Sequence, residues 1–428
     1  MILLISIIGI SMAVTFALRI PVGFSLGITS LMGLLAAGKI PLTVIPQRLV
    51  IGMDSFSLMA IPFFILAGNL MNFGGITNRI IDFCNSLLGR FHGGLGLTNI
   101  GASMVFGGVS GSMIADTTAL GTVLIPAMVK QGYHPDFAAA LTASASLCGP
   151  IIPPSIPMVV FGVITGVSIL SLFLGGIIPG ILIGLFLGVH VYFVAVKRGY
   201  PKMHPANLRE IFISLKRAFW ALMMPVVMLT GLLSGVFTPT EAAVVAAVYA
   251  LLVGVLVYRE MTLPNLIRSF ITSAKTTGQV LMIVAFAQLF AWVLIAYNIP
   301  QMFTEFLLAL TKSPILILLI LNVLMLVMGC FMDPISNMVI LLPLVMTTIK
   351  TVGIDPVHFG VVMTYNLCMG LLTPPFGMSL FIASSIAQIS FQRIVVATAP
   401  FLITLLLLLL LIIFIPSTIT SIPYWWAK

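Results

Sequence analysis

Long apolar runs, separated by short polar connections, extend over the whole chain. Residues 218–236, 240–257 and 394–415 contain only one charged side chain, Glu241. Each run is long enough for an α-helix to cross a bilayer, and each is continuously apolar rather than alternating as in a membrane β-strand. The pattern predicts a polytopic, all-α membrane protein with helices at about 2–18, 21–37, 58–73, 171–196, 218–236, 240–258, 278–296 and 394–415.

Segments of mixed polarity predict helices that lie along the membrane surface. Residues 76–91 place Arg79, Asp82 and Arg90 among apolar positions at helical spacing, which suits an interfacial helix. The longest polar connection, 197–217, is expected to be a loop rather than a domain. Further interfacial or amphipathic segments are expected at 41–53, 263–275 and 300–312.

Two other apolar segments in each half are interrupted by Gly and Pro. One is a hairpin, predicted at 94–130 in the first half and at 313–350 in the second, with GGVSGSMIADTT and GCFMDPISN in the middle. The other is a span broken by CGPIIPPS or GLLTPPFG, because tandem prolines cannot lie inside a continuous helix. The predicted halves of these broken spans are 136–148, 155–168, 356–370 and 376–388.

The interruptions recur at matching spacings, so the two halves of the chain are repeats. Asp116 and Asp333 each stand ten residues before a proline, and they are 217 positions apart. Later matches are 221 apart, which predicts four extra residues in one connection. These later matches pair Pro135, Gly149, Pro153, Pro154 and Pro179 with Pro356, Gly370, Pro374, Pro375 and Pro400.

The placement of Lys and Arg predicts the orientation in the membrane. Residues 197–217 are rich in basic side chains, so they are expected in the cytoplasm. The basic residues predicted on that side are Lys197, Arg198, Lys202, Arg209, Lys216, Arg217, Arg19, Arg79, Arg90, Lys130, Arg259, Arg268, Lys275 and Arg393. Those predicted opposite are Lys39, Arg48, Lys312, Lys350 and Lys428. Both termini then face the periplasm and the hairpins enter from opposite faces, so the repeats are inverted.

Paired helix breaks of this kind are typical of a transporter's binding site at the membrane midplane. Unwound backbone exposes carbonyl oxygens, which coordinate a small cation, and helix N-termini, which favour an anion. We expect two or more coupling sodium ions, one site being formed by each hairpin with the break of its own repeat. The candidate sodium ligands are Ser103, Ser110, Ser112, Asp116, Thr117, Gly149, Pro150, Gly329, Asp333, Asn337, Gly370 and Thr373. The candidate substrate contacts are Ser112, Thr117, Pro153, Pro154, Asn337, Pro374 and Pro375.

Two interpretations of the hairpin aspartates stay open. Burying an unpaired carboxylate near the midplane costs on the order of 3 kcal/mol or more, so a carboxylate there needs a partner. Asp116 and Asp333 can therefore be ligands of a bound ion. They can instead cap helices, as the sequence Asp333-Pro334 suggests, because Pro is favoured at the first helical position. The hydroxyl residues at 110–118 and 142–146 can likewise line the site or mediate close helix packing.

Composition excludes several classes of function. Hydrophobic residues make up 60% of the 428 and charged residues 7%, too few charges to cover a soluble domain. The net charge of +9 reflects the loops of a membrane protein, and no nucleic-acid partner is expected. The sequence contains no nucleotide-binding or hydrolase motif, so we expect no enzymatic activity.

Four motifs carry a resemblance to a known family. They are GGVSGSMIADTTALGTVLIPAM, CGPIIPPSIPMVVFG, MAIPFFILAGNLM at 59–71 and GVFTPTEAAVVAAVYALLVG at 235–254. With them, essentially the whole chain resembles the large membrane subunit of tripartite ATP-independent periplasmic (TRAP) transporters. The resemblance implies a secondary transporter of a bacterial or archaeal inner membrane, driven by a sodium gradient. Its cargo would be an organic acid, such as a sialic acid or a C4-dicarboxylate.

The resemblance also implies partners and a motion. The partners would be a small four-helix membrane subunit, expected as a separate polypeptide, and a periplasmic substrate-binding protein. The fold is expected to be an elevator-type inverted repeat similar to divalent-anion/sodium symporters. Those symporters carry Ser-Asn-Thr at the hairpin tips, where this chain has Asp116-Thr117-Thr118 and Asp333-Pro334-Ile335. Ligation by backbone carbonyls is compatible with this difference.

The elevator interpretation divides the chain into a scaffold and a moving part. The alternative is a stand-alone sodium/dicarboxylate symporter that needs no binding protein. The expected divisions are scaffold and first interfacial arm 1–93, transport repeat one 94–196, basic loop 197–217, scaffold and second arm 218–312, and transport repeat two 313–428.

Overall fold

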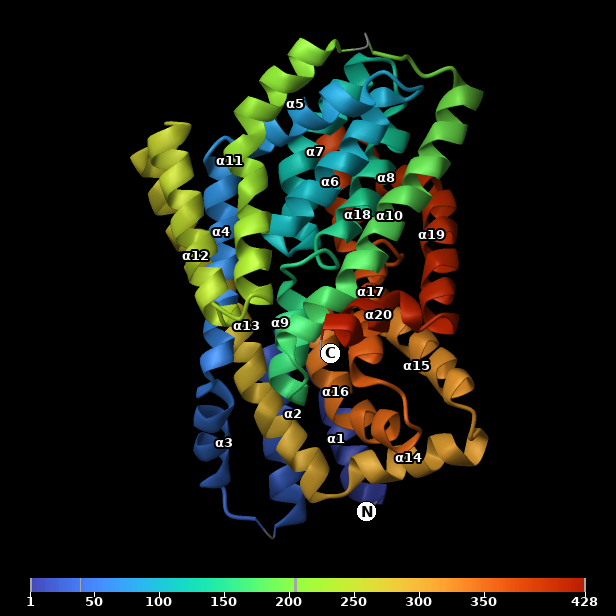
Figure 1. Cartoon of the computed structure of the whole chain (residues 1–428). Coiled ribbons are helices and arrows are strands. Elements are labelled where there is room, and N and C mark those ends of the chain that lie inside the picture. Colours follow the sequence, from blue (N-terminus) through green and yellow to red (C-terminus); the bar gives the residue numbers. More distant parts are fainter. Residues whose placement is uncertain (1, 39, 204–205, 427–428) are drawn as a thin grey trace.

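The computed structural model describes residues 2–38, 40–203 and 206–426, in which every regular element is a helix (Figure 1). Two residues of the orientation pattern, Lys39 and Lys428, lie outside the described residues. Eight of the described helices are long and apolar enough to span a membrane. The first half comprises α1 (Ile2–Ala17), α2 (Val22–Ala37), α3 (Val44–Met53), η1 (Phe56–Met59), α4 (Ala60–Phe73), α5 (Ile76–Leu88), α6 (Gly94–Ser110), α7 (Met113–Lys130), α8 (Pro135–Ala145), η2 (Ser146–Cys148), α9 (Ile156–Thr165) and α10 (Ile169–Arg198). The second half comprises α11 (Leu208–Leu233), α12 (Pro239–Leu252), η3 (Val253–Val257), α13 (Leu263–Ala296), α14 (Ile299–Leu310), α15 (Pro314–Gly329), α16 (Pro334–Thr351), α17 (Pro356–Gly370), α18 (Met378–Ala387), α19 (Phe391–Phe414) and α20 (Ser417–Trp426).

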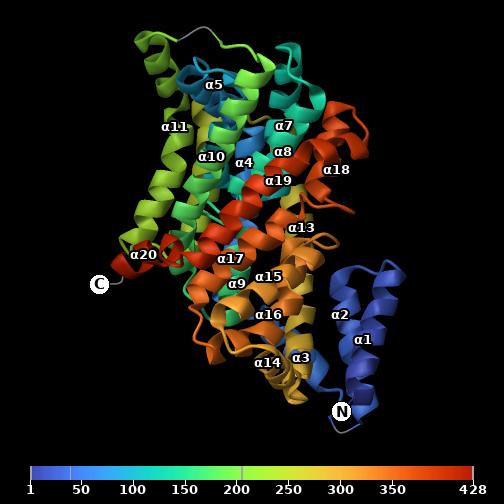
Figure 2. The same ribbon diagram turned by 90° about the vertical axis from the view of Figure 1, so that its right-hand side faces the viewer.

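The two hairpins enter the fold from opposite ends. Hairpin one, formed by α6 and α7, lies toward the upper end of Figures 1 and 2, where α5 also lies. Hairpin two, formed by α15 and α16, lies toward the lower end near α14. The N-terminus is at this lower end, whereas α10 ends and α11 begins at the upper end. The fold is therefore the predicted inverted repeat with two re-entrant hairpins and two broken helices.

Helix boundaries correct the predicted register between the repeats. α7 and α16 begin 221 positions apart, and so do α8 and α17. The connections between α7 and α8 and between α16 and α17 therefore have equal lengths, and the prediction of four extra residues in one connection is wrong. The sequence match paired Asp116 with Asp333 because each precedes a proline by ten residues. In the structure the two aspartates occupy different turns of their hairpin helices.

Two bodies of helices pack around the middle of the molecule. In one, α13 contacts α2, α3 and α4, and α12 contacts α4 and α11. The small buried side chains of α12, including Ala243, Ala246 and Ala250, allow the close approach typical of membrane helices. In the other body, each repeat packs one helix against the other repeat. α9 of the first repeat packs on α16, and α18 of the second repeat packs on α7 and α8. The second half of each broken helix thus connects one repeat to the other.

Two predicted boundaries differ from those observed. Residues 208–217, expected in a loop, are helical, because the backbone N–H of Asn207 donates to Glu210 at 3.0 Å and starts α11 there. The predicted break after residue 275 is absent, since α13 runs from Leu263 to Ala296 with its only proline in the first turn.

The C-terminal helix α20 was not predicted. It packs on α10 and α17 and lies across them at mid-height in Figure 1. The Tyr424 hydroxyl donates to the carboxylate of Asp355, which also accepts from the N-terminal N–H groups of α17. The short apolar sequence of α20 follows the longer apolar run of α19 directly, so composition alone does not separate these two helices.

Candidate functional site

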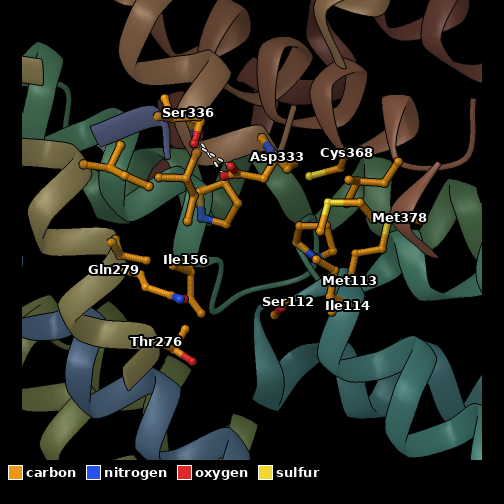
Figure 3. Close-up of a pocket in the computed structure, with 18 of the residues that line it drawn as sticks. Ser112, Met113, Ile114, Ile156, Thr276, Gln279, Asp333, Ser336, Cys368 and Met378 are labelled. Carbon is orange, nitrogen blue, oxygen red and sulfur yellow. Dashed lines mark hydrogen bonds between the residues drawn. The ribbon is translucent and has the colours of Figure 1, made fainter. Parts of the chain in front are cut away.

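All four interruptions of the apolar segments border one cavity of about 410 Å³ (Figure 3). The two hairpin tips line it from different sides, and the breaks in both broken helices complete the wall of the repeats. The remaining wall comes from α2, α4 and α13, and α13 contributes Thr276 and Gln279. The lining residues are Pro21, Val22, Gly23, Ile65, Gly111, Ser112, Met113, Ile114, Pro150, Ile156, Pro157, Thr276, Gln279, Val280, Met282, Ile283, Asp333, Pro334, Ile335, Ser336, Cys368, Leu371 and Met378.

The hairpin tips approach the helix breaks closely, and glycines make this possible. A Cβ on Gly370, at the end of α17, would lie 2.5 Å from the backbone carbon of Gly329, the last residue of α15. A Cβ on Gly107 of α6 would lie 3.0 Å from the backbone of Cys148 and Gly149. Each hairpin is therefore in backbone contact with the break of its own repeat. Both Pro–Pro peptide bonds, Pro153–Pro154 and Pro374–Pro375, are cis.

Asp116 is fully buried one turn inside α7. The Ser110 hydroxyl donates to its Oδ1, whereas its Oδ2 has no hydrogen-bond partner among the described residues. A Cβ on Gly149 would collide with Oδ2, so the carboxylate lies directly against the first break. The two ion pairs among the described residues do not involve Asp116. A carboxylate oxygen buried in this way requires a cation or a proton as its partner.

Asn337 occupies the equivalent position in hairpin two, 221 residues after Asp116. Its Nδ2 donates to the backbone carbonyls of Met328 at 3.2 Å and Met332 at 3.1 Å, at the tip of the hairpin. Its Oδ1 is buried without a partner. The same position of both repeats thus presents a buried side-chain oxygen with no internal donor, which is the kind of ligand a sodium ion takes.

The two N-caps of the hairpin helices are also equivalent. Ser112 caps α7 and accepts from the backbone N–H of Ala115 at 3.5 Å. Asp333 caps α16, where it accepts the backbone N–H of Ser336 at 3.0 Å and also the Ser336 hydroxyl. Of the two interpretations of the aspartates, capping therefore describes Asp333. It does not describe Asp116, because the cap of α7 is Ser112.

Some of the other candidate sodium ligands have an oxygen without a hydrogen-bond partner, whereas the oxygens of others already form hydrogen bonds within the protein. Ser103 is fully buried with an unpartnered hydroxyl, on the face of α6 that also carries Ser110. The hydroxyl of Thr117 donates to Met113 at 2.9 Å, so it is engaged within α7. In the breaks, the Thr373 hydroxyl donates to the carbonyl of Met369 at 3.2 Å, and the carbonyl of Pro150 accepts the Ser155 hydroxyl at 2.5 Å.

Only one of the candidate substrate residues lines the cavity. This residue is Ser112, and two candidate sodium ligands, Pro150 and Asp333, line it as well. The cavity wall does not include Thr117, Pro153, Pro154, Asn337, Pro374 and Pro375. The first residues of the helices that follow the prolines, Ile156, Pro157 and Met378, form the wall instead.

Sequence reasoning missed the wall supplied by α13. Thr276 and Gln279 lie one turn apart on this helix and project from it beside the cavity in Figure 3. A signal was present in the sequence, since Thr276-Thr277-Gly278-Gln279 is a polar patch preceding a long apolar run. The expected helix boundary at these residues concealed it.

The cavity combines several helix N-termini, which favour an anion, with one acidic side chain and no basic one among its lining residues. The first residues of α7, α9, α16 and α18 all line the wall, so four helix N-termini meet there. Each N-terminus carries a partial positive charge and backbone N–H groups that lack a helical acceptor, although Pro157 and Pro334 have no N–H. No Lys, Arg or His is among the lining residues, and Asp333 is the one acidic residue.

Comparison with known proteins agrees with this architecture. The sequence model of the family "Tripartite ATP-independent periplasmic transporter, DctM component" matches residues 9–418 of this chain. The sialic acid TRAP transporter large permease protein SiaM of Vibrio cholerae is 41% identical, over 90% of each chain. The C4-dicarboxylate TRAP transporter large permease protein DctM of Rhodobacter capsulatus is 36% identical, over 94% of this chain and 95% of that protein. Among solved structures, the Alcanivorax borkumensis YdaH transporter shares the fold with a TM-score of 0.63 and 14% identity, over 90% of this chain and 89% of the other.

The fold and the site define a secondary transporter of the membrane rather than an enzyme. The chain belongs to the DctM family and is the large membrane subunit of a TRAP transporter. Membership implies a multi-pass protein of the bacterial inner membrane. It also implies two partners, a small membrane subunit and a periplasmic binding protein.

Proposed function

We propose that this subunit imports an organic acid together with sodium ions, through the cavity between the two hairpin tips. The observation that carries the proposal is the convergence of four helix N-termini on a cavity without basic side chains. A carboxylate fits this environment, because backbone N–H groups and helix dipoles attract negative charge. Sialic acid and C4-dicarboxylates, transported by the relatives named above, are the substrate classes we favour.

We assign one sodium site to each repeat. In repeat one the unpartnered Oδ2 of Asp116 lies against the break at Gly149, and the unpartnered hydroxyl of Ser103 is one turn before Gly107, which contacts the same break. In repeat two the unpartnered Oδ1 of Asn337 belongs to the hairpin that contacts Gly370. Backbone carbonyls exposed at the breaks would complete both sites. A bound cation near each tip would also attract the substrate carboxylate, which the protein itself meets with no cationic side chain.

We propose an elevator motion for transport. Residues 94–196 and 313–428 would move together, because α9 and α18 connect the two repeats. Residues 1–93 and 218–312 would form the scaffold, with α13 as the wall past which the cavity slides. The substrate would then contact the moving hairpin tips throughout and Thr276 and Gln279 only in part of the cycle.

The basic segment 197–217 would face the cytoplasm and both termini the periplasm. On this orientation hairpin two opens toward the side from which the binding protein delivers its cargo. The small membrane subunit would support the scaffold body.

Uptake by the assembled system tests the proposal. The chain is reconstituted in proteoliposomes with its small subunit, and labelled sialic acid or succinate is added with the cognate binding protein. The proposal requires uptake that follows an inward sodium gradient and stops when potassium replaces sodium. Uptake of free acid by this chain alone would favour the stand-alone symporter. Uptake by the complete system that ignores sodium would refute the coupling.

A further inference from the structure

A second cavity, of about 480 Å³, lies far along the repeats from the central one. It is formed where the C-terminal end of α10, the start of α19 and the start of α8 meet, and it shares no residue with the central cavity. α10 and α19 lie side by side at an outer edge of the molecule in Figure 1. The lining residues are Asp136, Phe137, His190, Val194, Arg198, Gln392, Arg393, Val396, Ala397, Pro400 and Phe401.

Two guanidinium groups belong to this pocket. Arg198 is held in position, with its Cζ 5.5 Å from the ring centre of Phe137 and its Nη1 donating to the Tyr200 hydroxyl at 3.3 Å. Arg393 approaches the Asp136 carboxylate only at 3.9 Å, and its side chain is 60% exposed. That carboxylate also accepts the backbone N–H of Phe137 at 2.8 Å. The pocket therefore keeps a net positive charge, and among the described residues no group saturates the donors of Arg393.

The remaining polar groups of the pocket are compatible with an anion. Ring nitrogen Nδ1 of His190 is 2.8 Å from the Thr404 hydroxyl, and the ring stacks on Phe401 with centroids 4.6 Å apart. Ser390, the N-cap of α19, makes no side-chain capping bond, so the first backbone N–H groups of α19 beside Gln392 lack that partner. These groups add to the positive end of the helix dipole.

Apolar surface continues from the mouth of the pocket along both helices. Val396, which lines the pocket, is 74% exposed, and Phe193 of α10 is 67% exposed. Farther along, Ile403 and Leu407 of α19 are exposed as well. A ligand that fits both parts has a phosphate or similar anionic head and two apolar chains.

We propose that this pocket binds the phosphate group of an anionic phospholipid, whose acyl chains lie on the exposed faces of α10 and α19. Basic pockets between membrane helices at the cytoplasmic side are suited to such headgroups, and the Lys and Arg pattern predicts that side for Arg198 and Arg393. Arginine recognises phosphate through its planar fork of donors. The bound lipid joins α10 of repeat one to α19 of repeat two, at the point where Asp136 of α8 also meets them.

Lipid binding to the purified full chain tests the proposal. The delipidated protein is titrated in detergent with phosphatidylglycerol, with phosphatidylcholine of the same chains and with inorganic phosphate, and bound lipid is counted by native mass spectrometry. We expect tighter binding of phosphatidylglycerol than of phosphatidylcholine. The double substitution Arg198→Gln and Arg393→Gln should weaken phosphatidylglycerol binding by about tenfold to thirtyfold. Each basic residue near a membrane surface strengthens the binding of an anionic lipid by about fivefold.

Matched variants keep the result interpretable. Arg209→Gln with Lys216→Gln removes two exposed charges from α11, outside the pocket, and should leave binding unchanged. Val396→Asp keeps both arginines and adds a negative charge at the mouth, so it should weaken binding even if the double variant folds poorly. Equal affinity of wild type and both pocket variants for phosphatidylglycerol would overturn the proposal. So would inorganic phosphate that binds alone and displaces the lipid, since the ligand would then be soluble.

Discussion

Asp116 and Asn337 occupy the same position in the two hairpins, four residues after the N-caps Ser112 and Asp333. Each presents one buried oxygen without a hydrogen-bond partner. One member of the pair is an acid and the other an amide, so the two proposed sodium sites differ by one potential negative charge. The repeats are alike in backbone and unlike in electrostatics.

Replacement of Asp116 by Asn tests the charge in repeat one. A hydrogen bond or contact to a charged group contributes about 1.5–3 kcal/mol, so we expect the sodium concentration for half-maximal uptake to rise by about tenfold or more. Sodium titration of uptake in proteoliposomes measures it. Asp54→Asn, at the exposed end of α3, is the control and should behave as wild type. An unchanged sodium dependence in Asp116→Asn would remove this residue from the site.

Exchange of the hairpin caps separates capping from ion binding at Asp333. We expect Asp333→Ser to retain sodium-dependent uptake, because serine performs the same capping role in repeat one at Ser112. Asp333→Ala should destabilise the protein by about 1 kcal/mol and reduce uptake, since the start of α16 loses its acceptor. Thermal unfolding and uptake are measured on both variants. Loss of uptake in Asp333→Ser with normal stability would indicate that the carboxylate binds an ion directly.

The close contact between Gly329 and Gly370 predicts intolerance of a methyl group. Gly370→Ala places a Cβ 2.5 Å from the backbone carbon of Gly329. Backbone cannot rotate aside as a flexible side chain can, so the hairpin and the break must separate. We expect a loss of about 1–3 kcal/mol in stability together with loss of uptake. Gly278→Ala is the matched control, because a Cβ there meets nothing within 4 Å and alanine favours the helix. Equal thermal stability of the two variants would show that the contact is not tight.

The wall of α13 predicts a separation between substrate and sodium effects. Gln279→Ala and Thr276→Ala should raise the KM for the organic acid by about fivefold to tenfold, the effect expected when a hydrogen bond of about 1 kcal/mol or more is removed. Their sodium dependence should remain that of wild type, because neither residue belongs to a hairpin or break. Gln301→Ala, exposed on α14, is the control. A KM unchanged in both wall variants would exclude this face from the substrate path.

The sequence predicted the helices and breaks because their signals are local. Apolar length marks a span, and tandem prolines such as Pro153-Pro154 mark a break wherever they occur. The register between repeats was wrong because it depended on matching single residues. Helix starts determine register, and the cap of α7 is Ser112, which a search for matching aspartates overlooks.

The site was only partly predictable for a related reason. Sequence spacing indicates that hairpin tips and breaks belong together, but it does not indicate which side chain keeps a free oxygen. Thr117 and Thr373 appeared equivalent to Ser103 as ligands, yet each donates its hydroxyl to a backbone carbonyl of its own turn. Gln279 was missed because its wall comes from a helix outside the predicted hairpins and broken helices, and only the tertiary fold brings it to the cavity.

Protection of the cavity from chemical labelling tests the central claim most directly. Ile114→Cys places a reactive thiol on the cavity wall, in a Cys368→Ala background that removes the native thiol there. The rate of maleimide labelling is measured in the assembled transporter with sodium, with the transported acid, and with both. We predict that labelling slows markedly only when both are present, because the acid then occupies the space between the hairpin tips. Equal labelling rates under all conditions, in a variant that still transports, would contradict the account.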